Sequence, residues 1–274
     1  MTVSQALREA AQRLASTSDT ARLDAELLMA HALGVNRSDM LLRHMADPRP
    51  EDFAALVERR AAREPVAHIT GTQEFYGRDF AVSAQVLIPR GDSETLIDAA
   101  LETAPHAGRV LDLGTGSGAL LITVLMELED ATGIGIDASD AALKVARDNA
   151  QALGLIGAQA RFLLRDWRED GWDDSLGTFD LILCNPPYVE EDAPLDPDVR
   201  DYEPASALFA GPEGLDDYRV IIPQLRKLLS PKGVALLEIG AAQGDAVNEM
   251  AQGHGFAVQM RHDLANRPRC VVLW

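Results

Sequence analysis

A glycine-rich turn follows a short apolar run in the middle of the chain. After the run at residues 110–113 come Gly114, Thr115, Gly116, Ser117 and Gly118. Glycines let a backbone turn sharply and approach a ligand, and the helix that should follow supplies free N–H groups at its amino end. The turn is therefore either a ligand-binding turn or a tight connection with only a structural role.

An acidic residue, Asp137, ends the next strand-like run about 20 residues further on. A carboxylate at this place in an α/β sheet can accept hydrogen bonds from the hydroxyl pair of a ribose, and it favours a ribose without a phosphate. The turn has the spacing GxGxG and not the GxGxxG of dinucleotide sites. Together, the turn and Asp137 predict a site for a nucleoside-containing cofactor.

Asp166 and Trp167 come just after the strand-like run at residues 160–164. The carboxylate can accept a hydrogen bond from an adenine amino group, and the indole can pack on a flat ring. A surface acid beside a core tryptophan would give the same pattern. This pair alone therefore does not establish a site.

The most specific pattern is the turn formed by Asn185, Pro186, Pro187 and Tyr188, directly after the apolar run at residues 179–184. Two prolines cannot continue a central strand, so the chain must leave the sheet in a stiff conformation. Open α/β sheets bind their ligands at the carboxyl ends of the strands. A stiff polar turn at this edge predicts a functional site.

An alternation of strand-like and helix-like segments positions these residues. Strands are expected at residues 110–113, 132–136, 160–164, 179–184, 234–239, 256–260 and 270–273, with helices from residue 117 and at 139–153, 216–229 and 243–253. Such alternation is typical of a doubly wound α/β fold with a mostly parallel sheet. The last two strands have no helix between them, so the final strand should run antiparallel.

The first part of the chain has a different pattern. Apolar residues at helical spacing predict helices at residues 3–14, 23–33 and 38–44, and a fourth helix that begins at Pro50. Short β-like pieces around Gly71 and Gly77 then predict a hairpin. We therefore divide the chain into a small helical-bundle domain (residues 1–68), a β-hairpin linker (69–90) and an α/β domain (91–274).

The composition is that of a soluble globular protein, with 47% hydrophobic and 25% charged residues among 274. No run approaches the roughly 18 apolar residues that a membrane helix needs, and charged residues among the first 15 argue against a signal peptide. Cys184 and Cys270 both fall in apolar runs, which indicates buried reduced thiols and no metal site. We expect a cytoplasmic protein that does not bind a membrane.

The net charge of −18 is concentrated in the second part of the chain. Residues 1–90 hold 11 Lys and Arg against 12 Asp and Glu, whereas residues 91–274 hold 14 against 31. Between residues 166 and 217, around the expected site, 16 acidic residues face 2 basic ones. The negative charge of these residues repels phosphates and argues against direct binding of nucleic acid. The acidic residues form either a solvated surface or an acidic face for a basic partner.

The glycine turn, Asp137 and the Asn-Pro-Pro-Tyr turn together resemble class I S-adenosylmethionine-dependent methyltransferases that methylate a planar nitrogen. Adenine N-methyltransferases and protein glutamine methyltransferases share the Asn-Pro-Pro-Tyr string. Four further stretches, which extend the likeness over nearly the whole chain, resemble the HemK/PrmC family of release factor glutamine methyltransferases. They are Leu-Asp-Ala-Glu-Leu-Leu at 23–28, Glu-Pro-Val-Ala-His-Ile-Thr-Gly at 64–71 with Phe-Tyr-Gly at 75–77, Leu-Ile-Pro-Arg at 87–90, and Tyr-Glu-Pro at 202–204.

The resemblance implies a Rossmann-like sheet of seven strands and an N-terminal domain that recognises the substrate. It implies that a monomer uses S-adenosylmethionine to methylate the glutamine amide in the Gly-Gly-Gln motif of class 1 peptide chain release factors, with S-adenosylhomocysteine as product. The implied cofactor-binding residues are Gly114, Thr115, Gly116, Ser117, Gly118, Asp137, Asp166, Trp167 and Asn185. The implied substrate-binding residues are Asn185, Pro186, Pro187 and Tyr188.

The planar amide explains why these residue types are needed. An amide nitrogen is a poor nucleophile because its lone pair is delocalised, so catalysis must depend on positioning. The Asn185 side-chain oxygen and the Pro186 carbonyl would each accept one N–H of the amide, and Tyr188 would offer an aromatic face. Asn185, Pro186 and Tyr188 are therefore the catalytic candidates.

Two stretches depart from the family. Its usual Pro-Arg-Pro-Asp/Glu-Thr-Glu reads Pro-Arg-Gly-Asp-Ser-Glu at residues 89–94, so the rigidity of the second proline is lost. Residues 263–269 stand where the family commonly has a glycine-containing loop before the last strand. The conformations of both stretches are left open by the sequence.

Three other functions fit fewer features. An adenine N-methyltransferase would use the same turn to hold a flipped base, but it needs a basic groove. A nicotinamide-dependent oxidoreductase accounts only for the glycine turn. A protein that binds the cofactor and docks a translation factor without chemistry leaves the Asn-Pro-Pro-Tyr turn without a purpose.

Overall fold

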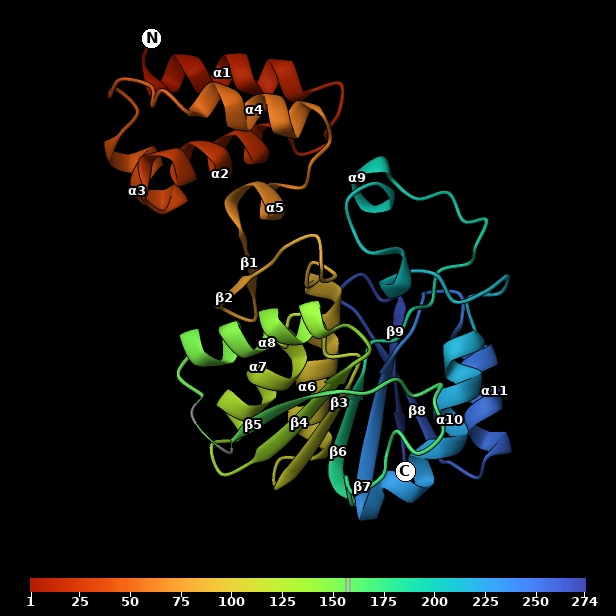
Figure 1. Cartoon of the computed structure of the whole chain (residues 1–274). Coiled ribbons are helices and arrows are strands. Elements are labelled where there is room, and N and C mark those ends of the chain that lie inside the picture. The colour runs from red at the N-terminus through yellow and green to blue at the C-terminus, as the bar shows by residue number, and fades with distance from the viewer. Residues whose placement is uncertain (156, 158) are drawn as a thin grey trace. The chain divides into compact units, whose positions relative to one another are not determined.

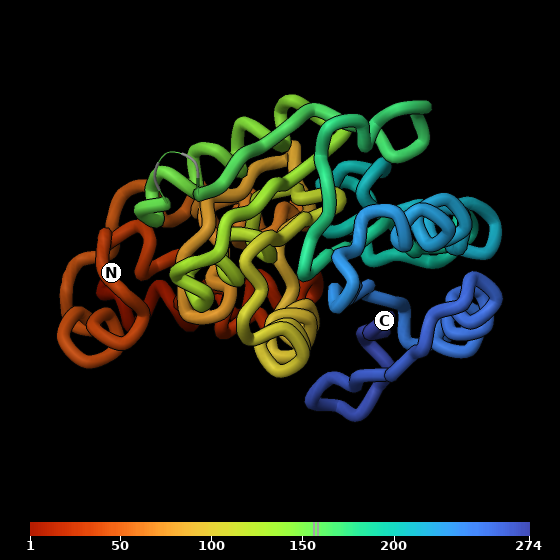
Figure 2. Tube along the Cα trace, turned by 90° about the horizontal axis from the view of Figure 1, so that it is seen from below, coloured from red at the N-terminus to blue at the C-terminus, as the bar shows by residue number. Residues whose placement is uncertain are grey.

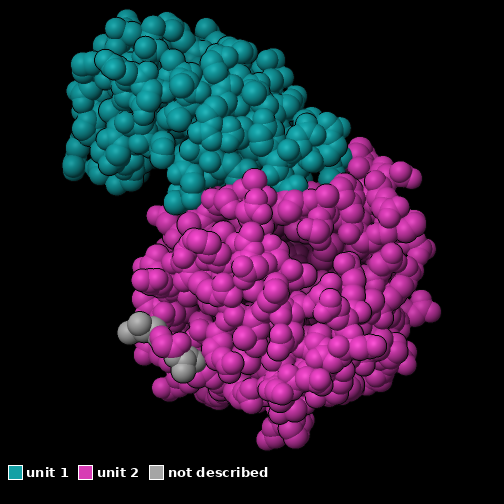
Figure 3. Space-filling model, in the orientation of Figure 1, with its two compact units in different colours: residues 1–72, 195–203 teal, residues 73–194, 204–274 magenta. Residues whose placement is uncertain are grey.

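The computed structural model describes residues 1–155, 157 and 159–274, and their contacts divide the chain into two compact units (Figures 1 and 3). Unit 1 contains Met1–Thr72 and Leu195–Glu203, and unit 2 contains Gln73–Pro194 and Pro204–Trp274. The sequence pattern places a domain boundary near residue 68, but it does not assign Leu195–Glu203 to the first unit.

Unit 1 is a small helical bundle. Its helices are α1 (Val3–Leu14), α2 (Ala21–Leu33), α3 (Arg37–Arg43), α4 (Phe53–Ala61), α5 (Val66–Thr70) and the single turn α9 (Pro197–Arg200). A capping box begins α1, in which Thr2 and Gln5 satisfy each other's backbone N–H groups. Leu7, Leu28 and Phe53 of α1, α2 and α4 are buried together in its core.

The fourth helix begins at Phe53, whereas the sequence pattern indicates a start at Pro50. The backbone before it is still paired with the N-terminus, because Thr2 forms an antiparallel bridge with Pro48 and the Arg49 N–H donates to the Met1 carbonyl. This pairing keeps the chain extended, so the helix starts later than its first possible residue.

A buried arginine holds Leu195–Glu203 in unit 1. Arg60 is 6% exposed and pairs with Asp24 at 2.6 Å and with Asp198 at 2.7 Å. The Tyr202 hydroxyl also donates to the Ala62 carbonyl at 2.9 Å. A loop that leaves unit 2 after Pro194 and returns at Pro204 therefore belongs structurally to unit 1.

A hairpin, β1 (Thr72–Phe75) and β2 (Arg78–Ala81), precedes a seven-stranded sheet. Its strands are β3 (Arg109–Leu113), β4 (Thr132–Asp137), β5 (Ala160–Leu164), β6 (Phe179–Cys184), β7 (Leu229–Glu238), β8 (Val258–His262) and β9 (Pro268–Leu273). Their order is β5-β4-β3-β6-β7-β9-β8; the pairs from β5 to β7 are parallel, and β9 runs antiparallel to both of its neighbours, β7 and β8. This confirms the predicted mostly parallel sheet of seven strands and its antiparallel final strand.

Helices cover both faces of the sheet (Figures 1 and 2). On one face lie α6 (Glu94–Thr103) and α7 (Ala119–Glu127), with α8 (Asp140–Ala152) beside them, and on the other lie α10 (Asp216–Leu228) and α11 (Gly244–Gly253). Successive residues of β6 alternate between the two cores: Leu181 and Leu183 face the first, and Ile182 and Cys184 face the second. Cys184 and Cys270 are buried and free, as predicted.

Several element ends differ from the sequence pattern. The helix after the glycine turn begins at Ala119, because Gly116 and Gly118 have φ values of 52° and 83°, outside the helical region. Strand β8 begins at Val258, because the Phe256 N–H donates to the Ala251 carbonyl and belongs to the turn after α11. Helix α6 falls where no element is predicted. Among the described residues, no helix is long and apolar enough to cross a membrane.

Candidate active site

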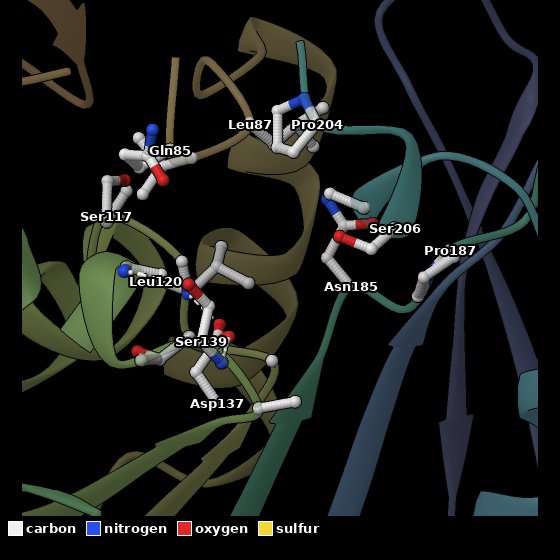
Figure 4. Close-up of a pocket in the computed structure, with 18 of the residues that line it drawn as sticks. Gln85, Leu87, Ser117, Leu120, Asp137, Ser139, Asn185, Pro187, Pro204 and Ser206 are labelled. Atoms are coloured by element: carbon white, nitrogen blue, oxygen red, sulfur yellow. Dashed lines mark hydrogen bonds between the residues drawn. The ribbon is translucent and has the colours of Figure 1, made fainter. Parts of the chain in front are cut away.

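A cavity of about 520 Å³ lies at the carboxyl ends of the parallel strands of unit 2 (Figure 4). Of the predicted site residues, it is lined by Gly114, Thr115, Gly116, Ser117, Asp137, Asp166, Trp167, Asn185 and Pro187. Gly118, Pro186 and Tyr188 are not part of this lining. The structure thus brings together residues from four strand ends that are up to 73 positions apart in sequence.

The glycine turn and Asp137 form one connected wall. The Gly116 N–H donates to Asp137 Oδ2 at 3.0 Å, and the Ser139 N–H donates to Asp137 Oδ1 at 2.9 Å. These bonds fix the carboxylate in place, and each oxygen keeps a lone pair for a further donor. Burial raises the pKa of Asp137, and the backbone hydrogen bonds oppose that rise. Asp137 is therefore an oriented acceptor at the cavity wall.

A second carboxyl, Asp112, lies beneath the glycine turn. It is 1% exposed, and its Oδ2 accepts the Thr115 hydroxyl at 2.6 Å, while Oδ1 has no hydrogen-bond partner in the described part of the chain. Burial raises its pKa to about 7, and the charge of Asp137 adds to the rise. Asp112 belongs to no motif of the sequence, although a carboxylate inside an apolar strand is an unusual feature.

We expect the Asp112→Asn variant to gain stability over the wild type as the pH rises, so that the difference in their free energies of unfolding favours the variant more at pH 8 than at pH 5. A carboxyl whose pKa is raised in the folded state stabilises it fully below about pH 3.8, and this contribution is lost as the pH rises to about 7. Asparagine keeps the acceptor for Thr115 but does not titrate. Thermal midpoints at the two pH values measure the difference, which should reach about 1 to 3 kcal/mol. Parallel pH curves for the two proteins would contradict it.

A buried carboxylate fixes the orientation of the Trp167 indole. Asp217 is fully buried and accepts the indole N–H at 2.8 Å, and Arg168 reaches both of its oxygens at 2.8 and 2.9 Å. The ring lies against the glycine turn, because a Cβ built on Gly114 would be 3.1 Å from Trp167 Cη2. The indole therefore has a fixed orientation at the wall of the cavity. Asp166 also lines the cavity, and its Oδ1 accepts the Arg168 N–H at 2.9 Å.

The Asn185 side chain lines the cavity on the side opposite to Asp137 (Figure 4). Its Nδ2 donates to Ser93 Oγ at 3.5 Å, a long hydrogen bond. The amide oxygen is then directed away from Ser93. Asn185 is therefore an acceptor available in the same cavity as the predicted ribose acceptor.

Tyr188 differs from its predicted role. Its hydroxyl donates to Glu238 Oε1 at 3.2 Å, and its ring packs against the core on the α10 and α11 face of the sheet. Gln243 donates to the Tyr188 carbonyl at 2.9 Å, which fixes the backbone of the turn. In this structure Tyr188 anchors the turn and does not present its ring to the cavity.

Three residues that no sequence motif marks support the Asn-Pro-Pro-Tyr turn: Glu238, Gln243 and Ser93. Glu238 is 1% exposed at the end of β7, and burial raises its pKa to about 7, with opposing effects from Ser93, Arg269 and Tyr188. The signal that could find it is a glutamate directly after the apolar run of a parallel strand. Within residues 1–155, 157 and 159–274, no three His, Cys, Asp or Glu side chains are placed to hold a metal ion.

Comparison with known proteins agrees with the fold. Residues 106–237 match a family described as a methyltransferase domain. The crystal structure of a methyltransferase from Pyrococcus furiosus aligns with a TM-score of 0.51 over 80% of this chain and 96% of that one, at 15% identity, a likeness of fold alone. The fold and the site thus define a Rossmann-like methyltransferase.

More specific matches cover the whole chain. Residues 5–71 match the PrmC N-terminal domain. Release factor glutamine methyltransferases from Cereibacter sphaeroides and Moorella thermoacetica are 44% and 39% identical to this chain, over 99% and 100% of it and 98% and 99% of their own lengths. One from Geobacter sulfurreducens is 41% identical over 87% of this chain and 84% of its own. The chain belongs to the release factor glutamine methyltransferase family.

Proposed function

We propose that this enzyme transfers a methyl group from S-adenosylmethionine to the side-chain amide nitrogen of the glutamine in the Gly-Gly-Gln motif of class 1 peptide chain release factors. The observation that carries the proposal is the position of Asn185, whose amide lines the same cavity as Asp137 and the glycine turn. This reaction requires one hydrogen-bond acceptor for the nucleoside of the cofactor and another for the amide of the substrate, both in one cavity. The family to which the chain belongs supports the choice of substrate.

The residues present fit S-adenosylmethionine. Asp137 is oriented to accept hydrogen bonds from the ribose hydroxyls, and the Trp167 indole is a rigid apolar surface for the adenine. A Cβ built on Gly116 meets no protein atom within 4 Å, so the backbone there is open to a ligand. When bound, this cofactor supplies an electrophilic methyl group on a sulfonium. We expect the methionine part to lie along the glycine turn.

The protein's contribution at the glutamine is positioning. Asn185 Oδ1 and the Pro186 carbonyl each accept one N–H of the substrate amide, which fixes the nitrogen and favours its pyramidal form as it attacks. No strong base is needed before the transfer, because the nitrogen becomes acidic once it carries the methyl group and then loses a proton. The two prolines keep both acceptors in a fixed relation.

The direct test is incubation with a recombinant class 1 release factor and isotopically labelled S-adenosylmethionine, followed by peptide mass mapping. We expect a single methyl group on the glutamine of Gly-Gly-Gln. An adenine-containing oligonucleotide should stay unlabelled in a parallel reaction. Label on the oligonucleotide, or on another residue of the release factor, would overturn the proposal.

We further propose that acidic residues after the Asn-Pro-Pro-Tyr turn attract a basic substrate. Asp198 pairs with Arg60 and Arg63, and Asp201 pairs with Arg200. In contrast, Glu190, Glu191 and Asp192 are exposed and, among the described residues, form no ion pair. These three side chains are free to contribute to an attractive field. A release factor that works against ribosomal RNA should carry basic residues near its modified loop.

For this reason kcat/KM for the release factor should fall about tenfold or more as salt rises toward 1 M, where the Debye length is about 3 Å. A short glutamine peptide should show a much smaller dependence. Changing Glu190 and Glu191 to glutamine and Asp192 to asparagine should flatten the salt dependence for the intact release factor. The same slope in the triple variant would mean that these charges only solvate the surface.

A further inference from the structure

The two stretches that depart from the family's usual sequence are joined to each other in the structure. Residues 89–94 run into α6, and residues 263–269 run into β9. The Asp92 carboxylate of the first stretch pairs with Arg269 at 2.8 Å and with Arg267 at 3.2 Å. Two ion pairs therefore connect a segment at the cavity to the start of the last strand of the sheet.

The loop before β9 is held by its own contacts. Asp263 Oδ1 accepts two backbone N–H groups of the loop, both at 2.9 Å, and Oδ2 accepts Arg267 Nε at 2.8 Å. Asn266 has a φ of 58°, a conformation that glycine adopts freely and asparagine tolerates. The Arg269 side chain is 9% exposed, and its Nη2 lies 3.5 Å from Asp263 Oδ2. Both arginines therefore keep their positions and a counter-charge without Asp92.

The stretch at the cavity contains a point of high backbone freedom. Pro89, Arg90 and Ser93 line the cavity, and Gly91 lies between them in sequence. Glycine loses more conformational freedom on folding than any other residue, whereas proline, which the family usually has at this position, fixes φ. Asp92 follows Gly91 directly, and its carboxylate is bound to arginines that are themselves fixed. The ion pairs therefore restrict the backbone at the place where the proline is absent.

We propose that Asp92 is a positioning residue: its ion pairs with the two arginines hold residues 89–93 at the wall of the cavity and replace the proline as the restraint on this backbone. Ser93 Oγ accepts the Asn185 side-chain N–H at 3.5 Å, so a displaced segment would disturb a neighbour of Asn185. The inference rests on the proposed function, because the reacting amide of the substrate is expected to lie beside Asn185.

The backbone at Gly91 is suited to a rescue experiment. Gly91 is the first residue of the 3₁₀ turn Gly91–Ser93, a position that does not need its N–H for the turn and that favours proline. A Cβ built there meets no atom of non-neighbouring residues within 4 Å. Arg90 before it has φ −103° and ψ 141°, the extended conformation that a residue before proline adopts. Gly91→Pro therefore fits this backbone and restores the restraint covalently.

The first measurement is hydrogen exchange, which does not need the substrate. The Ser93 and Glu94 N–H groups donate to carbonyls of the same turn, so their exchange reports its opening. We expect exchange at these two amides to be about tenfold faster in Asp92→Ala than in the wild type. In the double variant that combines Asp92→Ala with Gly91→Pro, exchange should return close to the wild-type rate, because proline reduces the freedom of the open state.

The second measurement is single-turnover methyl transfer to the release factor with enzyme in excess. We expect Asp92→Ala to slow transfer about tenfold, and Gly91→Pro in the same chain to restore it to within about threefold of the wild type. Gly91→Pro alone should stay within about twofold. If Asp92→Ala does not fold, Asp92→Asn provides the comparison, because it keeps an acceptor but loses the charge, and its effects should be smaller and in the same direction.

A matched control removes a similar ion pair elsewhere in unit 2. Arg78 pairs with Glu127 at 2.6 Å, and the Glu127 side chain is 33% exposed, compared with 42% for Asp92. Neither residue of this pair lines the cavity. Glu127→Ala should leave exchange at Ser93 and the rate of methyl transfer within about twofold of the wild type.

The two measurements separate the possible failures. A wild type that leaves the release factor unmethylated, with the expected exchange pattern in the variants, would overturn the proposed function and support the restraint by Asp92. Exchange that does not change in Asp92→Ala, or that Gly91→Pro does not restore, would overturn the restraint. Faster exchange with an unchanged rate of methyl transfer would overturn the positioning role.

Discussion

Replacement of Asn185 with alanine should slow methyl transfer by about 100-fold or more, the usual loss when a positioned transition-state hydrogen bond is removed. The variant loses the acceptor that fixes one N–H of the substrate amide, and the delocalised nitrogen has no other activation. The Asn185 side chain lies across the cavity from Asp137, so the ribose acceptor is unaffected. Binding of S-adenosylhomocysteine should therefore survive much better than turnover.

The measurement combines single-turnover transfer with calorimetric titration of S-adenosylhomocysteine. Asn185→Asp is a useful companion, because it keeps the size and an acceptor oxygen but loses the N–H that donates to Ser93. We expect Asn185→Asp to retain more activity than Asn185→Ala. A near-normal turnover number in Asn185→Ala would refute the role of Asn185 in holding the amide.

The sheet could be predicted from the sequence because its signals are local. Apolar runs of five or six residues, glycines after β3 and prolines after β6 define where buried parallel strands begin and end. The rule that ligands bind at the carboxyl ends of such strands then predicts that Gly116, Asp137 and Asn185 lie at one place. The cavity lining includes all three.

The orientation of Tyr188 could not be predicted in the same way. In a turn, the direction of a side chain depends on its partner, and the partner of the Tyr188 hydroxyl is Glu238, 50 residues later. The assignment of the loop Leu195–Glu203 to unit 1 could not be predicted for the same reason. It depends on the pairing of Arg60 with Asp198, which are 138 residues apart. Neither long-range pair leaves a periodic signal in the sequence. Side-chain networks of this kind become visible only in three dimensions.

Replacement of Asp137 with alanine should weaken binding of S-adenosylmethionine by about 1 to 3 kcal/mol, since hydrogen bonds to a charged acceptor are lost. The structure adds a second effect, because Asp137 also accepts the N–H groups of Gly116 and Ser139. Alanine therefore removes an anchor of the glycine turn as well as the ribose acceptor. Asp137→Asn separates the two effects, because its one remaining oxygen can keep a backbone bond but carries no charge.

Gly116→Val should weaken binding of S-adenosylmethionine more than Asp137→Ala does. The φ of 52° at Gly116 is strained for a β-branched residue, and the side chain would point into space that the protein leaves open for the ligand. Calorimetric titration measures all three variants, and the thermal midpoint without ligand shows how much of each loss is structural. Affinity equal to that of the wild type in Asp137→Ala would exclude Asp137 as the ribose acceptor. The glycine turn would then have to bind the cofactor through its backbone alone.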